Sequence, residues 1–268
     1  MRPEQPARVL RSVPHLQAAH PDWTWQLPGL PEESVLLAAH TPALVKRIAV
    51  PPDIDDDTPH FPGIEVHARR AVGAALQAGA LAGTGKKAFS LMRPPGHHCT
   101  RERAMGFCYL NQIAIAALHE ASRGRRVAVW DFDAHHGNGT EDILKGRPDT
   151  FFASVHQYPG YPGTGTTSSG NCRNYPVAPR TPREAHMNEL ARSWEAVLDF
   201  QADLVLVSAG FDAYARDPIT EMSLETGDFA ELGRWLRQAG TPAAALLEGG
   251  YSPDLPLLID AFLSAWEK

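Results

Sequence analysis

The sequence has few cysteines and no long apolar run. Three cysteines occur among 268 residues, Cys99, Cys108 and Cys172, and no two have CxxC spacing. An odd number of cysteines without this spacing fits free thiols in a reducing compartment. No apolar run reaches the roughly 18–20 residues of a membrane helix. The polar N-terminus also lacks the apolar core of a secretory signal. We therefore expect a cytoplasmic protein with no membrane partner.

An excess of positive charge is also lacking. Lys and Arg number 25 against 31 Asp and Glu, which gives a net charge of −6 and argues against a nucleic-acid partner. Apolar residues at 43% and charged residues at 21% are ordinary for a globular protein and exclude extensive disorder. Repeats and low-complexity linkers are absent. We expect a single catalytic domain over residues 1–268, and the sequence leaves homo-oligomerisation open.

Short apolar runs alternate with longer amphipathic ones. This alternation predicts an α/β fold, in which a mostly parallel central sheet is flanked by helices. The predicted strands are Ala88–Met92, Val127–Trp130, Phe151–Val155, Leu204–Ser208 and Ala243–Leu247. The predicted helices are Ile64–Leu81, Gln112–Ser122, Arg183–Phe200, Thr226–Gln238 and Leu255–Trp266. Pro51–Pro59 and Tyr158–Pro182 are rich in turn-forming residues and are predicted as loops.

Four predicted strands lead directly into unusual polar segments. These segments are Arg93–His98, Asp131–Gly137, Ala209–Asp212 and Glu248–Tyr251. In open α/β sheets, sites form at the carboxyl ends of the strands, so the four segments can meet in one pocket.

The second segment has the spacing of a metal site. Asp131, Asp133 and His135 are two residues apart, so along an extended chain they point to the same side. Their oxygen and nitrogen atoms suit a divalent ion such as zinc, and Asp212 can add a ligand from another strand end. Three protein ligands with one open position are typical of a catalytic site. Taken alone, Asp212 can equally form a turn or cap a helix.

The other segments supply groups that can move protons. His97 and His98 follow a Pro-Pro-Gly turn and can act as general base and acid, although two turn histidines are the plainer interpretation. Tyr251 can donate a hydrogen bond to an oxyanion. Gly249 and Gly250 before it let the backbone approach a ligand closely, and Gly249 is a candidate substrate contact.

Together these residues resemble those of the zinc-dependent histone deacetylase family, which includes bacterial deacetylase-like amidohydrolases and acetylpolyamine amidohydrolases. The resemblance runs in order along nearly the whole chain. It is carried by RPPGHH, MGFCYLN, DFDAHHGNGT, YPGTG, SAGFDAYARDP and EGGY, which begin at residues 93, 105, 131, 161, 208 and 248. It implies the three-layer arginase/deacetylase fold. The N-terminus departs from the pattern, because a strand that usually precedes Arg2–Arg8 is missing or shortened.

The resemblance also implies a role for each matching residue. The ligands of one catalytic zinc ion would be Asp133, His135 and Asp212. His97 and His98 would be catalytic together with Tyr251, and Asp131 and Asn138 would orient the two histidines, so Asp131 would not bind zinc. Substrate would contact Asp57, Gly106, Phe107 and Tyr161. A structural potassium ion would involve Asp131, Asp133, His135, Ser154 and Val155.

The implied reaction is hydrolysis of an acyl amide, with release of acetate and a free amine. The substrate would be an acetyl-lysine protein or a small acetylated amine, and acetylpolyamine hydrolysis is the main alternative. An arginase-like ureohydrolase is a further alternative, but its second metal needs an acid where Gly137 stands. The remaining alternative is an inactive module that only binds acyl-lysine.

Overall fold

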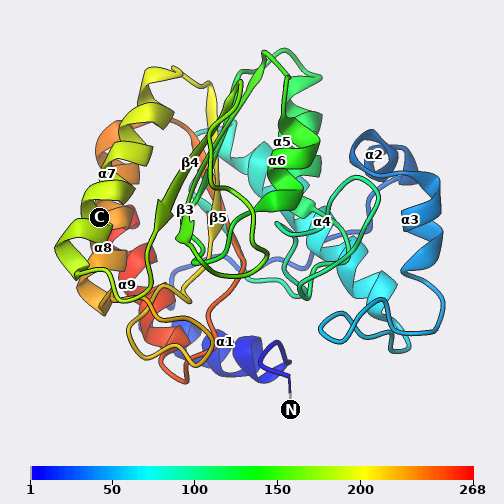
Figure 1. Ribbon diagram of the computed structural model, residues 1–268, viewed down its shortest axis with the longest axis horizontal. Helices are drawn as coiled ribbons and strands as arrows, with labels where there is room; N and C mark the ends of the chain where they lie inside the picture. The colour runs from blue at the N-terminus through cyan, green and yellow to red at the C-terminus, as the bar shows by residue number, and fades with distance from the viewer. Residues whose placement is uncertain (1) are drawn as a thin grey trace.

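The computed structural model describes residues 2–268, which form a six-stranded sheet between two layers of helices (Figure 1). Every strand pair is parallel, as the sequence pattern predicted for most of the sheet. The strands are β1 (Ala88–Ser90), β2 (Val127–Asp131), β3 (Thr150–Gln157), β4 (Cys172–Val177), β5 (Leu204–Ala209) and β6 (Ala243–Leu247). The helices are α1 (Ala7–Ala19), α2 (Glu33–Ala39), α3 (Pro42–Arg47), α4 (Ile64–Ala82), α5 (Gln112–Ala121), α6 (Asn138–Leu144), α7 (Arg183–Asp199), α8 (Thr226–Ala239) and α9 (Leu255–Glu267).

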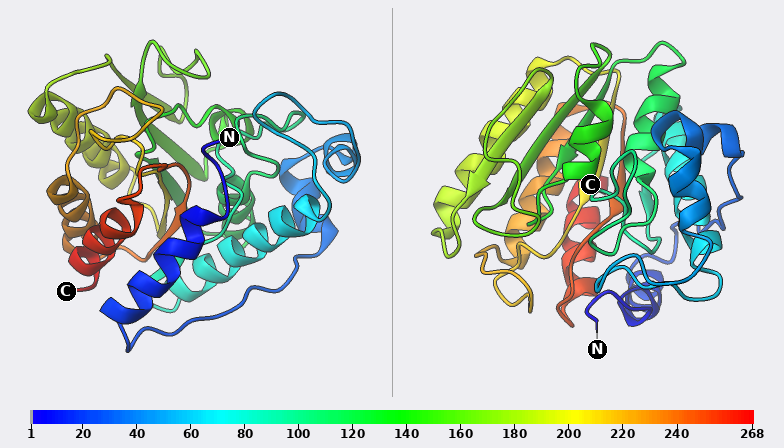
Figure 2. Two further views of the ribbon diagram at one scale, coloured as in Figure 1. Left: turned by 90° about the horizontal axis from the view of Figure 1, so that it is seen from below. Right: turned by 45° about the vertical axis from the view of Figure 1, so that its right-hand side comes forward.

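Two apolar cores lie on opposite faces of the sheet. Val127 and Val129 of β2 face the core beneath α2–α6, whereas Ala128 and Trp130 face the core beneath α1 and α7–α9. Successive side chains of a strand alternate between its faces, so a strand covered on both sides is apolar throughout. Figure 2 shows the helices on both sides of the sheet, with α1 (blue) packed beside α9 (red). None of the helices within residues 2–268 combines the length and apolar character needed to cross a bilayer.

The order of strands across the sheet is β1-β6-β5-β2-β3-β4. The four strands with polar continuations, β1, β6, β5 and β2, are therefore consecutive neighbours. The register aligns Asp131 at the end of β2 with Ser208 of β5, and Ser208 with Leu246 of β6. Because all strands are parallel, their carboxyl ends meet at one edge.

One predicted loop contains a strand. Tyr158–Pro182 was predicted to lack regular structure, but β4 lies within it and pairs with β3. The prediction was wrong because β4 is an edge strand, where Pro176 is tolerated and polar residues alternate with buried ones. Helices α1, α2, α3 and α6 were also not predicted. Pro14 interrupts the α1 pattern, and the other three helices have only six or seven residues.

Candidate active site

Asp133, His135 and Asp212 form a buried cluster at the carboxyl ends of β2 and β5. The His135 Nδ1 atom lies 3.1 Å from Asp133 Oδ1 and 3.0 Å from Asp212 Oδ2. The other Asp133 oxygen accepts from the Gly249 N–H at 2.7 Å, and Asp212 Oδ1 accepts from the Ala134 N–H at 2.8 Å. The backbone thus turns one oxygen of each carboxylate toward the His135 ring.

This cluster fits a zinc ion. One ligand atom from each of the three residues can be chosen so that all lie within 4.8 Å of one another. Ligands about 2.0–2.1 Å from a tetrahedral zinc ion lie roughly 3.3 Å apart, close to the distances around His135. Burial lowers the pKa of His135, but Asp212 and Asp133 outweigh burial and raise it well above its usual value. Two buried carboxylates therefore demand positive charge here, which a divalent ion would supply.

Asp131 lies beside this cluster but is bonded elsewhere. Its Oδ2 atom is 3.0 Å from His97 Nδ1. The spacing-based interpretation that grouped Asp131 with the metal ligands is therefore not supported by the geometry. The backbone explains why, because Asp131 still belongs to β2 whereas Asp133 and His135 lie in the turn beyond it.

The tandem histidines are held by different partners. His98 Nδ1 lies 2.8 Å from Asn138 Oδ1, an amide rather than a carboxylate, and the two imidazole rings are 4.0 Å apart. Burial lowers the pKa of His97, but Asp133 and Asp131 outweigh it and raise this pKa to about 10. The pKa of His98 falls well below its usual value because of burial and the charges of His97 and His135. The pair can therefore hold one protonated and one neutral ring.

Residues 2–265 match the histone deacetylase domain. The chain belongs to the histone deacetylase family. The match covers the metal cluster, both histidines and Tyr251, and zinc dependence is general in this family.

Three relatives illustrate the range of this histone deacetylase family. A probable deacetylase of Methanothermobacter thermautotrophicus is 41% identical over 214 residues, which are 75% of this chain and 64% of that protein. The acetylpolyamine amidohydrolase of Mycoplana ramosa is 33% identical over 256 residues, 87% of this chain and 74% of that protein. The crystal structure of an acetylpolyamine aminohydrolase from Burkholderia pseudomallei superposes with a TM-score of 0.89 at 27% identity, covering 99% of this chain and 91% of that chain. The chain thus spans just under two thirds of the first relative's length.

Aromatic residues surround the metal cluster of this family member. The Tyr161 ring is 5.0 Å from that of His98, and the Phe107 ring is 5.8 Å from that of Tyr251. Gly106 and Phe107 both have positive φ, 56° and 68°, which is rare for a bulky residue. A side chain at Gly106 would press against His98 and Tyr161, so the backbone there approaches the site closely.

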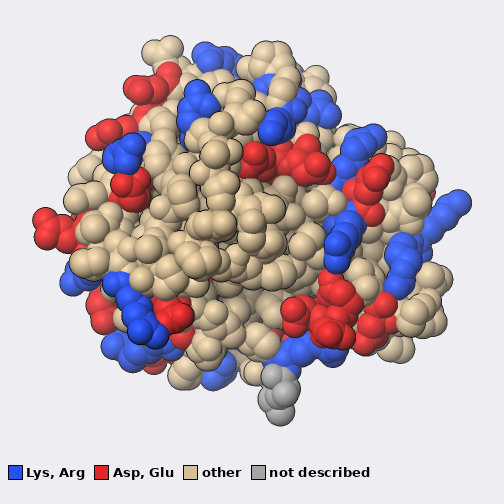
Figure 3. Space-filling view, in the orientation of Figure 1, with Lys and Arg blue, Asp and Glu red and all other residues tan. Residues whose placement is uncertain are grey.

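Two other predicted substrate contacts lie in different surroundings. Asp57 is exposed in the acidic loop before α4. Burial raises the pKa of the Tyr161 hydroxyl, and the negative charge of Asp57 raises it further. Figure 3 shows acidic side chains gathered at the lower right of this face, where Figure 1 places that loop. Gly249 instead packs against the metal cluster, where a side chain would overlap the Asp212 carboxylate.

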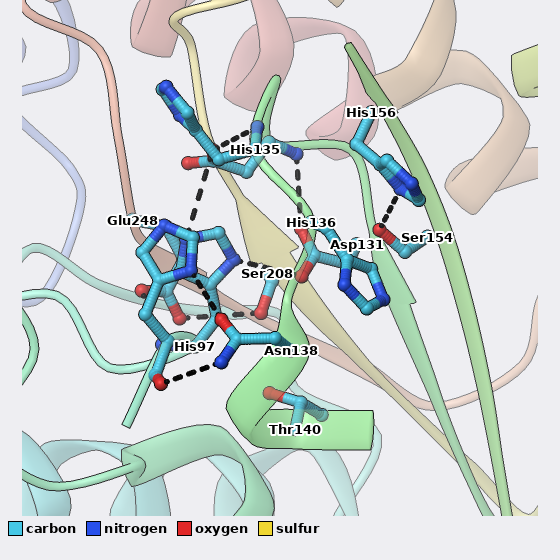
Figure 4. Close-up of polar contacts among 12 residues, drawn as sticks. His97, Asp131, His135, His136, Asn138, Thr140, Ser154, His156, Ser208 and Glu248 are labelled. Carbon is cyan, nitrogen blue, oxygen red and sulfur yellow. Dashed lines mark hydrogen bonds and ion pairs between the residues drawn. The ribbon is translucent and has the colours of Figure 1, made fainter. Parts of the chain in front are cut away.

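Two of the five residues predicted to bind potassium, Asp133 and His135, belong to the metal cluster itself. Asp131 of β2 is aligned with Ser154 of β3, and both Ser154 and Val155 are buried. The Ser154 hydroxyl is 2.9 Å from His156 Nδ1 (Figure 4). His136 Nε2 contacts Glu141 at 2.9 Å, so this histidine supports the loop rather than the cluster.

Sequence reasoning missed several residues that hold the site together. The Arg8 side chain, almost fully buried, donates from Nε to the Gly250 carbonyl at 2.8 Å. Asp217 accepts the Tyr251 N–H at 2.7 Å. Asn111 caps α5 and donates to the Cys99 carbonyl at 3.1 Å, behind the tandem histidines. Each of these residues is a charged or amide residue within a family motif, which is a signal in the sequence. The sequence does not show which group each of them contacts.

Proposed function

We propose that this protein removes acetyl or related acyl groups from amine nitrogen, with Asp133, His135 and Asp212 holding one catalytic zinc ion. The observation that carries the proposal is the meeting of that cluster with the two histidines at one sheet edge, each histidine having a different partner. When bound, zinc would act as a Lewis acid on the amide carbonyl and acidify a water molecule.

The protein's own residues supply the proton transfers. The neutral His98 ring would accept a proton from the attacking water at Nε2, because its Nδ1 is engaged by Asn138. The same atom would return that proton to the leaving amine. The His97 ring, paired with Asp131, would remain positively charged and favour the anionic transition state. Asp131 and Asn138 thus give two identical side chains different roles.

Tyr251 would stabilise the oxyanion. Burial raises the pKa of its hydroxyl well above the usual value, so the group stays protonated and able to donate. Phe107 and Tyr161 would line the path of the acyl chain, with the main chain of Gly106 and Gly249 beside it. Asp57 would hold the polar part of the substrate at the rim.

We further propose an acetyl-lysine protein or a small acetylated amine as the substrate. The acetylpolyamine amidohydrolase relative and the acidic loop around Asp57 support the polyamine alternative. An arginase-like reaction is disfavoured, because an acid at Gly137 would overlap the Asp131 carboxylate. A potassium ion at Asp131, Asp133, His135, Ser154 and Val155, a cytoplasmic location and a possible homo-oligomer remain predictions.

The proposal can be tested with a substrate panel on zinc-loaded protein. Release of the free amine is measured from acetyl-lysine peptides, acetylputrescine, acetylspermidine and lysines with longer acyl chains, and release of urea is measured from arginine. We expect turnover of at least one acetylated amine and none of arginine. Failure to hydrolyse any member, with one zinc ion bound per chain, would leave only the acyl-lysine-binding module.

A further inference from the structure

Glu248 is a buried acid to which the proposed mechanism assigns no role. Its side chain is fully buried at the end of β6, three residues before Tyr251. Its Oε2 atom accepts the N–H of Gly96 at 2.7 Å and that of His97 at 3.2 Å. The Ser208 hydroxyl donates to Oε1 at 3.3 Å (Figure 4). All three donors are neutral groups.

The backbone of the turn that carries the tandem histidines is also held by other contacts. The His97 carbonyl accepts from the N–H groups of Gly139 and Thr140, at 3.0 and 3.1 Å. A side chain at Gly96 would lie 2.8 Å from the Leu110 carbonyl oxygen, so the turn is packed closely on that side. Glu248 holds the N–H groups on the preceding side of His97, those of Gly96 and His97 itself. The His97 backbone is therefore fixed between β6 and the start of α6.

The same stretch of chain places Tyr251. Arg8 donates to the carbonyls of Glu248 and Gly250, and the Gly249 N–H donates to Asp133. The backbone from Glu248 to Tyr251 is thus tied at each residue to another part of the site. A movement of the Glu248 side chain would shift the histidine turn relative to the tyrosine.

We propose that Glu248 is a positioning residue, whose side-chain oxygens lock the Gly96–His97 turn to β6 and so set the histidines against Tyr251. The expected effect of this lock on catalysis rests on the proposed function. The lock depends on the length of the Glu248 side chain and on its hydrogen bonds, and not on its charge. Burial also raises the pKa of Glu248 to about 7, so its charge is only weakly held at neutral pH.

The contacts allow reach and charge to be separated. In Glu248→Gln, the amide oxygen can accept from both Gly96 and His97, and the amide nitrogen can donate to the Ser208 hydroxyl. In Glu248→Asp, the charge is kept but the side chain is one methylene shorter. Glu120→Gln is a matched control, because Glu120 is also buried but pairs with Arg125 near the far end of α5.

We expect Glu248→Gln and Glu120→Gln to keep kcat close to wild type. Glu248→Asp should lower kcat by about 100-fold with KM little changed, since a shift near 1 Å can cost that much. Zinc content should be equal in all four proteins. Loss of kcat in Glu248→Gln, or full kcat in Glu248→Asp, would overturn the positioning role.

A second measurement does not depend on activity. Amide hydrogen exchange of the Gly96–His97 segment is followed by mass spectrometry in the metal-free proteins. We expect faster exchange in Glu248→Asp and unchanged exchange in Glu248→Gln. Equal exchange in the two variants would contradict the lock. If wild type hydrolyses no substrate but the exchange result holds, the proposed function fails while the lock stands.

Discussion

The guanidinium carbon of Arg8 lies 4.7 Å from the centre of the Tyr251 ring. The same guanidinium is paired with Glu4 at 3.0 Å and donates to two carbonyls of the strand end that precedes Tyr251. Helix α1, from the first residues of the chain, thus supports a side chain near its last residues.

Removing Arg8 should therefore impair both stability and catalysis. Arg8→Met removes one partner of the buried Glu4 carboxylate, which still pairs with Arg93 Nη2 at 2.7 Å. The expected loss is therefore smaller than the about 3–5 kcal/mol that it costs to leave a buried charge without any partner. We expect urea unfolding to show that loss and kcat to fall with it. In the double variant Arg8→Met, Glu4→Gln, kcat should stay low, because Tyr251 still lacks its support. Recovery of kcat to the wild-type value would contradict the link to Tyr251.

The two proton-handling groups can be removed singly. Tyr251→Phe deletes one hydroxyl and should lower kcat by about 100- to 1,000-fold, as for loss of an oxyanion donor. His98→Ala should lower it by about 100- to 10,000-fold. Zinc content, measured by atomic absorption, should stay unchanged in both. His119→Ala on α5 serves as the control, and wild-type turnover in either active-site variant would refute its assigned role.

Metal removal should inactivate the protein reversibly. Chelation should abolish amide hydrolysis, and zinc should restore it. Zinc should also raise the unfolding free energy, by about 4 kcal/mol at a concentration 1,000 times its Kd. Asp212→Asn should lose most of this stabilisation, because one of the two charges around His135 is removed. Thermal unfolding with and without zinc gives the comparison; an undiminished shift in Asp212→Asn would exclude Asp212 as a ligand.

Acid should weaken the fold through His40. This side chain is fully buried, accepts the Asn111 N–H at Nε2 (2.9 Å) and donates from Nδ1 to the Thr100 carbonyl (3.0 Å). Burial lowers its pKa to about 4, below the value near 6.5 of an unfolded histidine. The unfolded state therefore binds more protons between these values. The contribution is complete above pH 6.5 and is lost as pH falls toward 4, about 3 kcal/mol in all.

His40→Gln tests this expectation. The variant cannot titrate, so its unfolding free energy should change by about 3 kcal/mol less than that of wild type between pH 7 and pH 4. Urea unfolding at several pH values provides the measurement. His156 and His186, whose pKa values burial also lowers, are present in both proteins and cancel in the difference. Parallel pH profiles would assign the acid sensitivity to other groups.

Much of the sheet could be predicted from local pattern. Val127–Asp131 and Leu204–Ala209 are apolar along their lengths because helices cover both faces, and this is visible in one dimension. Edge strand β4 carries no such signal, since exposed residues, among them Pro176, are interspersed with its buried ones. The short helices α2, α3 and α6 have too few turns to show a period.

The sequence by itself determined the layered α/β architecture, the chemical groups at four strand ends and, through its motifs, the family. Only the tertiary structure decided which of those groups contact one another. It placed β1, β6, β5 and β2 side by side, bonded Asp131 to His97 instead of the metal cluster, and brought Arg8 beneath Tyr251. The reason is physical: local pattern reports which side chains are buried, whereas a buried charge acquires its role from the partner that long-range packing brings within hydrogen-bond distance.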